Sequence, residues 1–260
     1  MSEDKKVLLE VQKVKKEFVT SKSLTGKPLK IVHAVDSVDL TIYEGETIGV
    51  VGESGCGKST LGRCILQLIR PTAGNVLYRG EDITKLNKEQ MRQMRRKMQL
   101  IFQDPYASLN PRMTVLELIM APLEAFGIGT MEERVQRVKE IMELVGMPEN
   151  MMNRYPHEFS GGQRQRISIA RAILRDTPVI LFDEAVSNLD TDNEKYIQEM
   201  LRSRLQGKTV LMIAHRLSTI LSADKVVVLD HGKVIDSGTH EELINRCDIY
   251  RHLVEQQCEV

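Results

Sequence analysis

Apolar and polar residues alternate in two segments near the N-terminus of the chain. The alternation is clearest at the start of residues 7–19 and at the end of residues 31–42. Its apolar positions are Val7, Leu9, Val11, Val38, Leu40 and Ile42. A polar loop at residues 21–30 separates the two segments. Because a period of two is typical of a strand with one buried face, the pattern predicts two strands of an antiparallel β subdomain.

Four other short segments are almost entirely apolar, which predicts strands buried on both faces, as in a parallel sheet. They are residues 47–51, 179–182, 209–214 and 225–229. Further strands are predicted at residues 76–78 and 99–103, with a hairpin at 232–238. Helices are predicted at residues 61–69, 88–98, 114–126, 131–145, 160–173 and 190–205, and from Glu241 onward. The pattern therefore predicts an α/β fold in one domain, with a mostly parallel core sheet, the antiparallel β subdomain and a helical subdomain at about 104–175.

Two helical features each allow two interpretations. Residues 88–98 are basic, and a solvated helix face is favoured over a functional one. The helical stretch after them is rich in methionine, which more often means core packing but also suits an adaptable docking surface. The methionines are Met113, Met120, Met131, Met142, Met147, Met151 and Met152. Both interpretations of this stripe stay open, with core packing favoured.

The composition is that of a globular protein, with 260 residues of which 42% are hydrophobic and 28% charged. Lys+Arg and Asp+Glu both number 36, and a zero formal charge argues against a nucleic-acid-binding protein built on electrostatic attraction. The polar N-terminus is no signal peptide, and no apolar run approaches the roughly 20 residues that span a bilayer. The four cysteines lack metal-type spacing. A reduced, cytosolic chain is the simplest interpretation.

The segment 52–60 fits the pattern G-x-x-x-x-G-K-[ST], between a predicted strand and a predicted helix. Its candidate phosphate-binding residues are Gly52, Ser54, Gly55, Cys56, Gly57, Lys58, Ser59 and Thr60. Glycines let backbone N–H groups close around an anion, and the helix start adds its positive dipole end. Lys58 supplies a charge to the β- and γ-phosphates, and Ser59 is a candidate Mg²⁺ ligand. A glycine-rich turn that binds nothing is much less favoured.

Two acidic residues close the buried strand at 179–182. Asp183 is a candidate Mg²⁺ ligand, and Glu184 is a candidate general base for an attacking water. His215 follows another buried strand, where its imidazole could contact a γ-phosphate. Alternatively, Asp183 and Glu184 could simply be charged residues at the end of a strand, and His215 could be a structural histidine. The phosphate loop earlier in the chain favours the functional roles.

A second candidate anion site begins at Ser160. The sequence Ser160-Gly161-Gly162-Gln163 opens a helix, so its N–H groups could bind an anion, or the serine could simply cap the helix. The chain thus has two candidate phosphate-binding segments. The simplest way for both to bind the same nucleotide is that each comes from a different subunit. The pair therefore predicts a twofold dimer in which each chain covers the nucleotide of the other.

Taken together, these motifs resemble those of the nucleotide-binding domain of an ABC transporter. The resemblance identifies Walker A at 52–60, the Q-loop at Gln103, the signature motif at 159–163, Walker B at 179–183 followed by Glu184, the D-loop at 187–190 and the H-loop at His215. It implies that Phe18 stacks on adenine, that Asp190 lies at the nucleotide and that Gln103 helps to organise Mg²⁺ and water. It also implies ATP and Mg²⁺ as cofactors, a second ATPase subunit and separate permease subunits as partners, and a place on the inner face of the cell membrane.

The resemblance divides along the chain. Residues up to about 165 resemble the ATPase subunits of oligopeptide and dipeptide importers, as in residues 102–111 and 154–160. Residues after about 167 resemble the exporter branch, as in 213–220 and 236–243. This division suggests a hybrid, natural or engineered, joined near the signature helix.

The sequence thus predicts an ATPase that drives a transporter, with a peptide-importer-like docking region. A soluble or engineered hybrid ATPase with no transport partner is the alternative. A non-hydrolysing nucleotide-binding scaffold is a third possibility, against which the presence of Glu184 and His215 argues.

Overall fold

The computed structural model describes residues 5–22, 28–101, 109–183, 205–213, 221 and 223–258. The chain divides into two compact units, and each is described by itself. The first contains Met1–Met98, Val179–Asp183 and Gly207–Val260. The second contains Gln99–Pro178 and Glu184–Gln206. The boundaries predicted for the helical subdomain stay a prediction.

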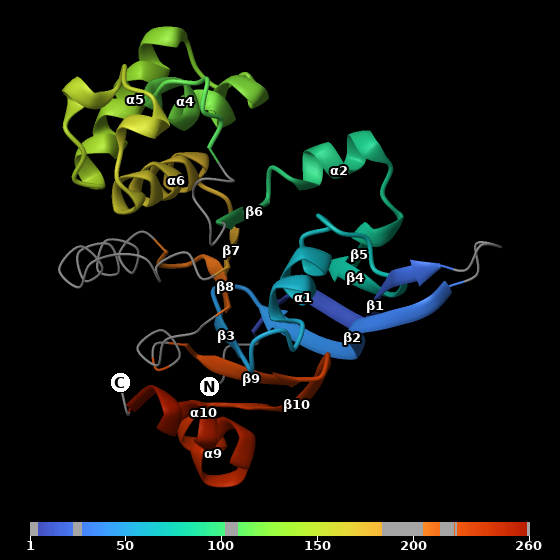
Figure 1. Cartoon of the computed structure of the whole chain (residues 1–260). Coiled ribbons are helices and arrows are strands. Elements are labelled where there is room, and N and C mark those ends of the chain that lie inside the picture. Colours follow the sequence, from blue (N-terminus) through green and yellow to red (C-terminus); the bar gives the residue numbers. More distant parts are fainter. Residues whose placement is uncertain are drawn as a thin grey trace. The chain divides into compact units, whose positions relative to one another are not determined.

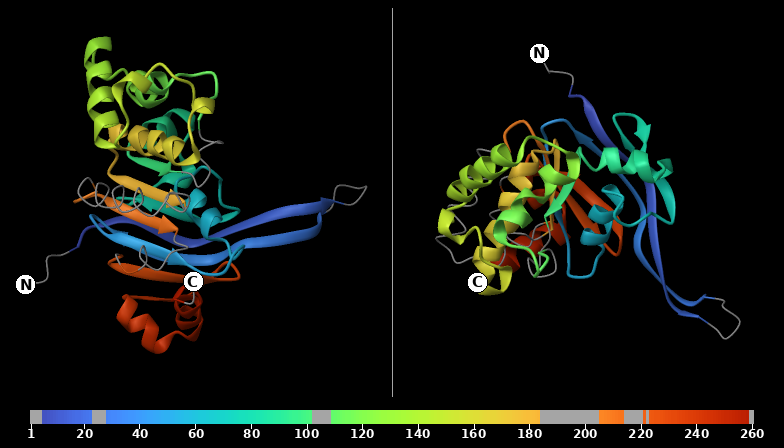
Figure 2. Two further views of the ribbon diagram at one scale, coloured as in Figure 1. Left: turned by 60° about the vertical axis from the view of Figure 1, so that its left-hand side comes forward. Right: turned by 90° about the horizontal axis from the view of Figure 1, so that it is seen from above.

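The first unit contains the predicted antiparallel sheet, with the strand order β2-β1-β4-β5. Its strands are β1 (Val7–Lys22), β2 (Pro28–Tyr43), β4 (Ala73–Tyr78) and β5 (Glu81–Asp82). In both views of Figure 2, β1 and β2 run side by side as one long ribbon. Both strands are longer than the alternation predicted, because their distal halves are exposed and carry no one-sided apolar pattern.

The second sheet is mostly parallel and forms the core of the first unit (Figure 1). Its strands are β3 (Thr47–Val51), β7 (Val179–Asp183), β8 (Thr209–Ile213), β9 (Lys225–Asp230) and β10 (Lys233–Gly238). Their order is β10-β9-β3-β8-β7, and β6 (Met98–Ile101), next in order, begins in the first unit. Only the β9–β10 pair among these five is antiparallel. Asp183 and Val50 both align with Ile213, so the carboxyl ends of three parallel strands lie at one edge.

Two helices of the first unit end earlier than predicted. Helix α1 (Lys58–Ile65) stops before residue 69 because Gln67 adopts a left-handed backbone with φ 54°, while its side chain donates to the carbonyl of Cys64. Helix α2 (Lys88–Met94) stops before residue 98 because Met98 already belongs to β6. A 3₁₀ turn, Ile83–Lys85, precedes α2. The basic residues around the end of α2 are exposed, as the solvated interpretation predicts, and the choice against a functional face stays a prediction.

Apart from Gln99–Ile101, which belong to β6, the regular elements described in the second unit are helices. They are α4 (Val115–Phe126), α5 (Met131–Leu144) and α6 (Gly161–Arg175), with 3₁₀ turns at Glu149–Met151 and Pro156–Glu158. Reciprocal capping boxes start all three α-helices, at Thr114, Thr130 and Ser160. Core packing is confirmed for the buried methionines Met120, Met142 and Met147, whereas Met131 is 53% exposed.

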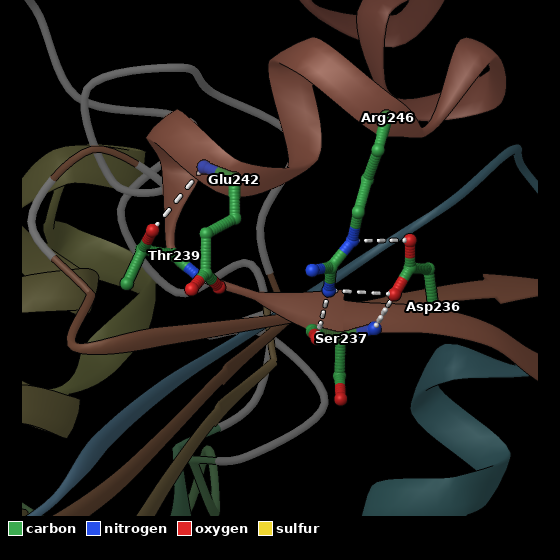
Figure 3. A network of polar contacts seen from close by, with 5 residues as sticks. All are labelled: Asp236, Ser237, Thr239, Glu242 and Arg246. Carbon is green, nitrogen blue, oxygen red and sulfur yellow. Dashed lines mark hydrogen bonds and ion pairs between the residues drawn. The ribbon is translucent and has the colours of Figure 1, made fainter.

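The predicted C-terminal helix is two helices, α9 (His240–Arg246) and α10 (Asp248–Cys258). A polar network ties α9 to β10 (Figure 3). Arg246 donates to both carboxylate oxygens of Asp236, at 2.9 and 3.0 Å, and to the carbonyl of Ser237 at 2.8 Å. Glu242 and Thr239 form a capping box at the start of α9. The network therefore fixes the direction in which the chain leaves the sheet.

Within the described part of the chain, no helix combines the length and the apolar character that a membrane crossing needs. Three described cysteines, Cys56, Cys64 and Cys247, are buried and free.

Candidate functional site

The phosphate loop lies between β3 and α1, the context that its sequence pattern requires. Lys58 is the first residue of α1 and only 5% exposed. Its ammonium group donates to the carbonyls of Gly52 and Glu53, both at 2.8 Å. The lysine therefore folds back onto the loop, with its charge against these two carbonyls. A phosphate oxygen, which carries a full charge, would be a stronger acceptor than either carbonyl.

Two glycines of the loop lie where any side chain would collide with backbone. Gly57 has φ 107°, and a Cβ on it would lie 2.0 Å from the carbonyl oxygen of Ala34 in β2. Gly52 has φ 151°, and a Cβ on it would lie 2.1 Å from the carbonyl oxygen of Leu229 in β9. The glycines therefore let the loop pack directly against two strands.

The turn between β9 and β10 also holds the loop. The N–H of Gly232 in this turn donates to the carbonyl of Cys56 at 2.9 Å. The carbonyl of Gly232 in turn accepts from the N–H of Asp36 in β2 at 2.8 Å. Sequence analysis predicted the hairpin and missed its contact with the loop. The contacting groups are backbone atoms, which leave no signal in side-chain identity.

Cys56 lies beside the charge of Lys58, with 4.0 Å between its sulfur and Nζ. Burial raises the pKa of the Cys56 thiol, and the nearby ammonium opposes this shift only in part. The loop cysteine therefore stays a neutral thiol at neutral pH.

Ser59 and Asp183 meet as the sequence predicted for two Mg²⁺ ligands. The Ser59 hydroxyl donates to Asp183 Oδ1 at 2.7 Å. Asp183 ends β7 and is 2% exposed, and Nη2 of Arg63 lies 3.4 Å from its other oxygen, Oδ2. Among the described residues no cluster of three or more His, Cys, Asp or Glu side chains forms a closed metal cage. One hydroxyl and one carboxylate beside a phosphate loop do fit Mg²⁺, which keeps several waters and takes phosphate oxygens.

Phe18 belongs to β1, which pairs with the strand that contacts the phosphate loop. It pairs with Val32, two residues from Ala34, whose carbonyl packs against Gly57. Its ring is 39% exposed, and Nζ of Lys16 lies 5.1 Å from the ring centroid. An exposed ring on a strand whose partner strand contacts the loop is suited to stacking on a base.

The signature segment belongs to the second unit and starts α6. Ser160 Oγ accepts from the N–H of Gln163 at 3.3 Å, and Gln163 Oε1 accepts from the N–H of Ser160 at 3.0 Å. The capping interpretation is therefore confirmed. A Cβ on Gly161 would meet nothing within 4 Å, so this helix start is open to an approaching group, and Gly162 is half-buried. The predicted contact of residues 160–163 with a nucleotide stays a prediction.

Four predicted site residues lie outside the described residues. They are Gln103, Glu184, Asp190 and His215. The predicted helix at 190–205 also lies outside them, except for its last residue. The roles of these residues stay predictions.

Comparison with known families agrees with the fold and the loop. Residues 35–187 match the family described as ABC transporter, which covers more than half of the chain. The chain belongs to the ABC transporter family, whose members contain an ATP-binding, ATP-hydrolysing cassette. The predicted α/β fold class, with its parallel core sheet, antiparallel sheet and helices, is confirmed.

Similar curated proteins carry the names of peptide transport ATPases. The oligopeptide transport ATP-binding protein OppF of Bacillus subtilis (strain 168) is 45% identical over 241 residues, covering 91% of this chain and 77% of that protein. OppF of Escherichia coli (strain K12) is 43% identical over 249 residues, covering 94% and 75%. Alignments of this length extend across the proposed join near residues 165–167. A hybrid origin is not shown.

Solved structures show the same cassette. The dimeric post-hydrolysis state of the ATP-binding cassette MJ0796 bound to ADP and Pi has a TM-score of 0.81 and 30% identity, covering 89% of this chain and 98% of that one. A bacterial Atm1-family ABC exporter with ATP bound has a TM-score of 0.79 at 24% identity, covering 99% of this chain and 42% of that one. At this identity the exporter supports the fold alone.

Proposed function

We propose that the chain is the Mg²⁺-dependent ATPase subunit of a peptide-importing ABC transporter. The observation that carries the proposal is the joint placement of Lys58 inside the phosphate loop and of Ser59 on the carboxylate of Asp183. The names of the OppF relatives supply the substrate class. The dimeric MJ0796 cassette supports a head-to-tail pair, formed with a second copy or a homologous subunit.

The reaction is the hydrolysis of ATP to ADP and phosphate. Lys58 and the loop N–H groups hold the phosphates. Ser59 and Asp183 would hold Mg²⁺, which would neutralise charge on the phosphate oxygens. Glu184 takes the proton of the attacking water as that water bonds to the γ-phosphorus and the bond from the γ-phosphorus to the β,γ-bridging oxygen breaks, so that ADP leaves with this oxygen. Gln103 positions the water, and His215 donates to the γ-phosphate.

The remaining contacts divide between the two chains of the dimer. Phe18 stacks on adenine in the chain that owns the phosphate loop. Residues 160–163 and Asp190 reach the nucleotide of the other chain. A composite site of this kind couples hydrolysis to dimer closure, because neither chain holds all of the contacts by itself.

Transport requires partners outside this chain. The relatives are named as ATP-binding proteins of peptide transport and import. The proposal is that this chain works with separate membrane-spanning permease subunits and lies at the inner face of the cell membrane when bound to them. Co-expression with a peptide permease tests this step. ATP hydrolysis stimulated by peptide in the purified complex is expected, whereas no association with the permease would contradict it.

Steady-state ATP hydrolysis, measured against protein concentration, tests the catalytic proposal. The rate per subunit is expected to rise with concentration, to require Mg²⁺ and to fall by at least about a hundredfold in Glu184→Gln, since a positioned base contributes about that much. Glu140→Gln, at an exposed position of α5, is the matched control and should match the parent chain. A concentration-independent rate would contradict the dimer, and an active E184Q variant would contradict the assigned base.

A further inference from the structure

Arg63 is a charged residue beside the metal-binding pair that no motif assigns. It follows Ser59 by four residues in α1, so both side chains lie on one face of the helix. Both reach the same carboxylate. Ser59 contacts Asp183 Oδ1 at 2.7 Å, and Arg63 contacts Oδ2 at 3.4 Å. Each oxygen of Asp183 therefore has its own partner on α1.

The burial of Asp183 shows why its contact with Arg63 matters. The Asp183 side chain is 2% exposed and that of Arg63 is 42% exposed. In the described part of the chain, no other cation lies within ion-pair distance of this carboxylate. Nε of Arg63 is buried without a partner, so the contact with Asp183 is the one polar contact described for its guanidinium. A buried carboxylate depends strongly on its compensating partners.

Gly62 sets the distance between α1 and Asp183. A Cβ on Gly62 would lie 2.6 Å from Leu181 Cδ1 in β7 and 3.2 Å from Ile213 Cδ1 in β8. The glycine therefore lets α1 lie close to the strand that Asp183 ends. Leu61, which is fully buried, fixes the rotation of the helix. This tight packing of α1 against β7 holds Arg63, the residue after Gly62, beside Asp183.

We infer that Arg63 is a positioning residue for the metal-binding carboxylate. Rotation about χ2 of an aspartate is only weakly restricted, so a single hydrogen-bond partner does not fix the orientation of the carboxylate plane. Arg63 on Oδ2 and Ser59 on Oδ1 define that plane from both sides. The Ser59 oxygen then keeps its lone pairs directed toward the phosphate loop, where Mg²⁺ would lie. The inference rests on the proposed function, because it assumes that Ser59 and Asp183 hold Mg²⁺.

Nucleotide binding, measured with a fluorescent ATP analogue, separates this role from a purely structural one. The variants are Arg63→Met, which removes the charge, and Arg63→Lys, which keeps it. Arg92→Met is the control, because Arg92 lies on α2 with only a 3.7 Å contact to Glu89. Affinity is measured in EDTA and then against increasing Mg²⁺, and melting temperature without nucleotide reports on folding.

In R63M, we expect an affinity in EDTA within about twofold of the parent and a Mg²⁺ concentration for half-maximal effect about tenfold higher, as for other partners of metal ligands. R63K should stay within about threefold of the parent, because the observed contact uses a single donor. R92M should match the parent. Should R63M not fold, Arg63→Gln removes the charge, keeps a polar group and carries the same expectation.

An unchanged or lower Mg²⁺ requirement in R63M would overturn the inference. So would an R63K variant as impaired as R63M, because side-chain packing, not the charge, would then be responsible. If Mg²⁺ has no effect on the parent chain itself, the proposed function fails and this inference fails with it. The parent chain and the variants therefore test the two proposals separately.

Discussion

The contact between Gly57 and Ala34 makes Gly57→Ala a sharp test of how the phosphate loop is held. Gly55 provides a matched control in the same loop. Both glycines have positive φ, 107° at Gly57 and 81° at Gly55. A Cβ on Gly57 would lie 2.0 Å from the Ala34 carbonyl oxygen, whereas a Cβ on Gly55 would meet nothing within 4 Å. The two alanine variants therefore share backbone strain and differ in the collision.

The expected difference follows from these two contributions. A left-handed backbone costs an alanine about 1–2 kcal/mol, and this cost applies to both variants. Forcing an extra carbon against backbone costs about 1–3 kcal/mol more, and this cost applies to G57A alone. For a chain of this size, 1 kcal/mol shifts the melting temperature by about 2–4 °C. We therefore expect G57A to melt about 2–12 °C below G55A.

Thermal unfolding without nucleotide is the assay, followed by circular dichroism. Leaving nucleotide out restricts the comparison to the loop itself, since a Cβ at either position could also touch a bound phosphate. Equal melting temperatures for G57A and G55A would refute the reasoning, because the packing of the loop against β2 would then contribute nothing to stability.

Two further predictions concern the C-terminal part of the chain. Hydrogen bonds from Arg246 lower the pKa of Asp236 below its usual 3.8, so the stabilisation is present above about pH 3.8 and is lost as the pH falls through the lowered value. As the pH falls below about 3.8, the melting temperature of Arg246→Met should therefore decrease less steeply than that of the parent, and parallel curves would contradict this. Tyr250→Phe removes a 2.8 Å hydrogen bond to His240 Nδ1 at a fully buried ring and should lower the melting temperature by about 2–4 °C, the equivalent of about 1 kcal/mol. Burial raises the pKa of Tyr250 to about 12, so the parent should lose stability as the pH rises from 10 toward 12 and Y250F should lose less; an unchanged melting temperature at neutral pH would contradict the hydrogen-bond assignment.

The elements of this fold were largely predictable because their signals are local. Continuous apolar runs at β3, β7, β8 and β9 identified the buried strands, since only a strand covered on both faces tolerates them. The predicted end of α1 was wrong for a physical reason. Leu68 and Ile69 continue the helical spacing, yet Gln67 takes a left-handed backbone and Leu68 is 45% exposed. Apolar spacing alone cannot distinguish a helix from a turn that follows it.

The predicted site was incomplete where backbone atoms or single long-range contacts build it. Lys58, Ser59 and Asp183 were found because their side-chain chemistry defines a motif. Ala34 and Leu229 were missed because they act through carbonyl groups, which every residue carries. Arg63 did leave a signal, a cation four residues after Ser59 on one helical face. Its meaning became clear only when the structure placed Asp183 beside it.

The packing of Gly52 against Leu229 has a consequence for biosynthesis. The two residues are 177 positions apart (229 − 52 = 177), so the ribosome makes the loop long before the strand that closes it. At about 5–20 residues per second, this interval is on the order of ten seconds or more. During this interval a nascent chain carries the loop sequence without the β9 backbone that shapes it. The emergence of β9 and the turn after it gives the loop its shape, so the capture of ATP waits for the synthesis of β9 and does not follow directly on that of the loop.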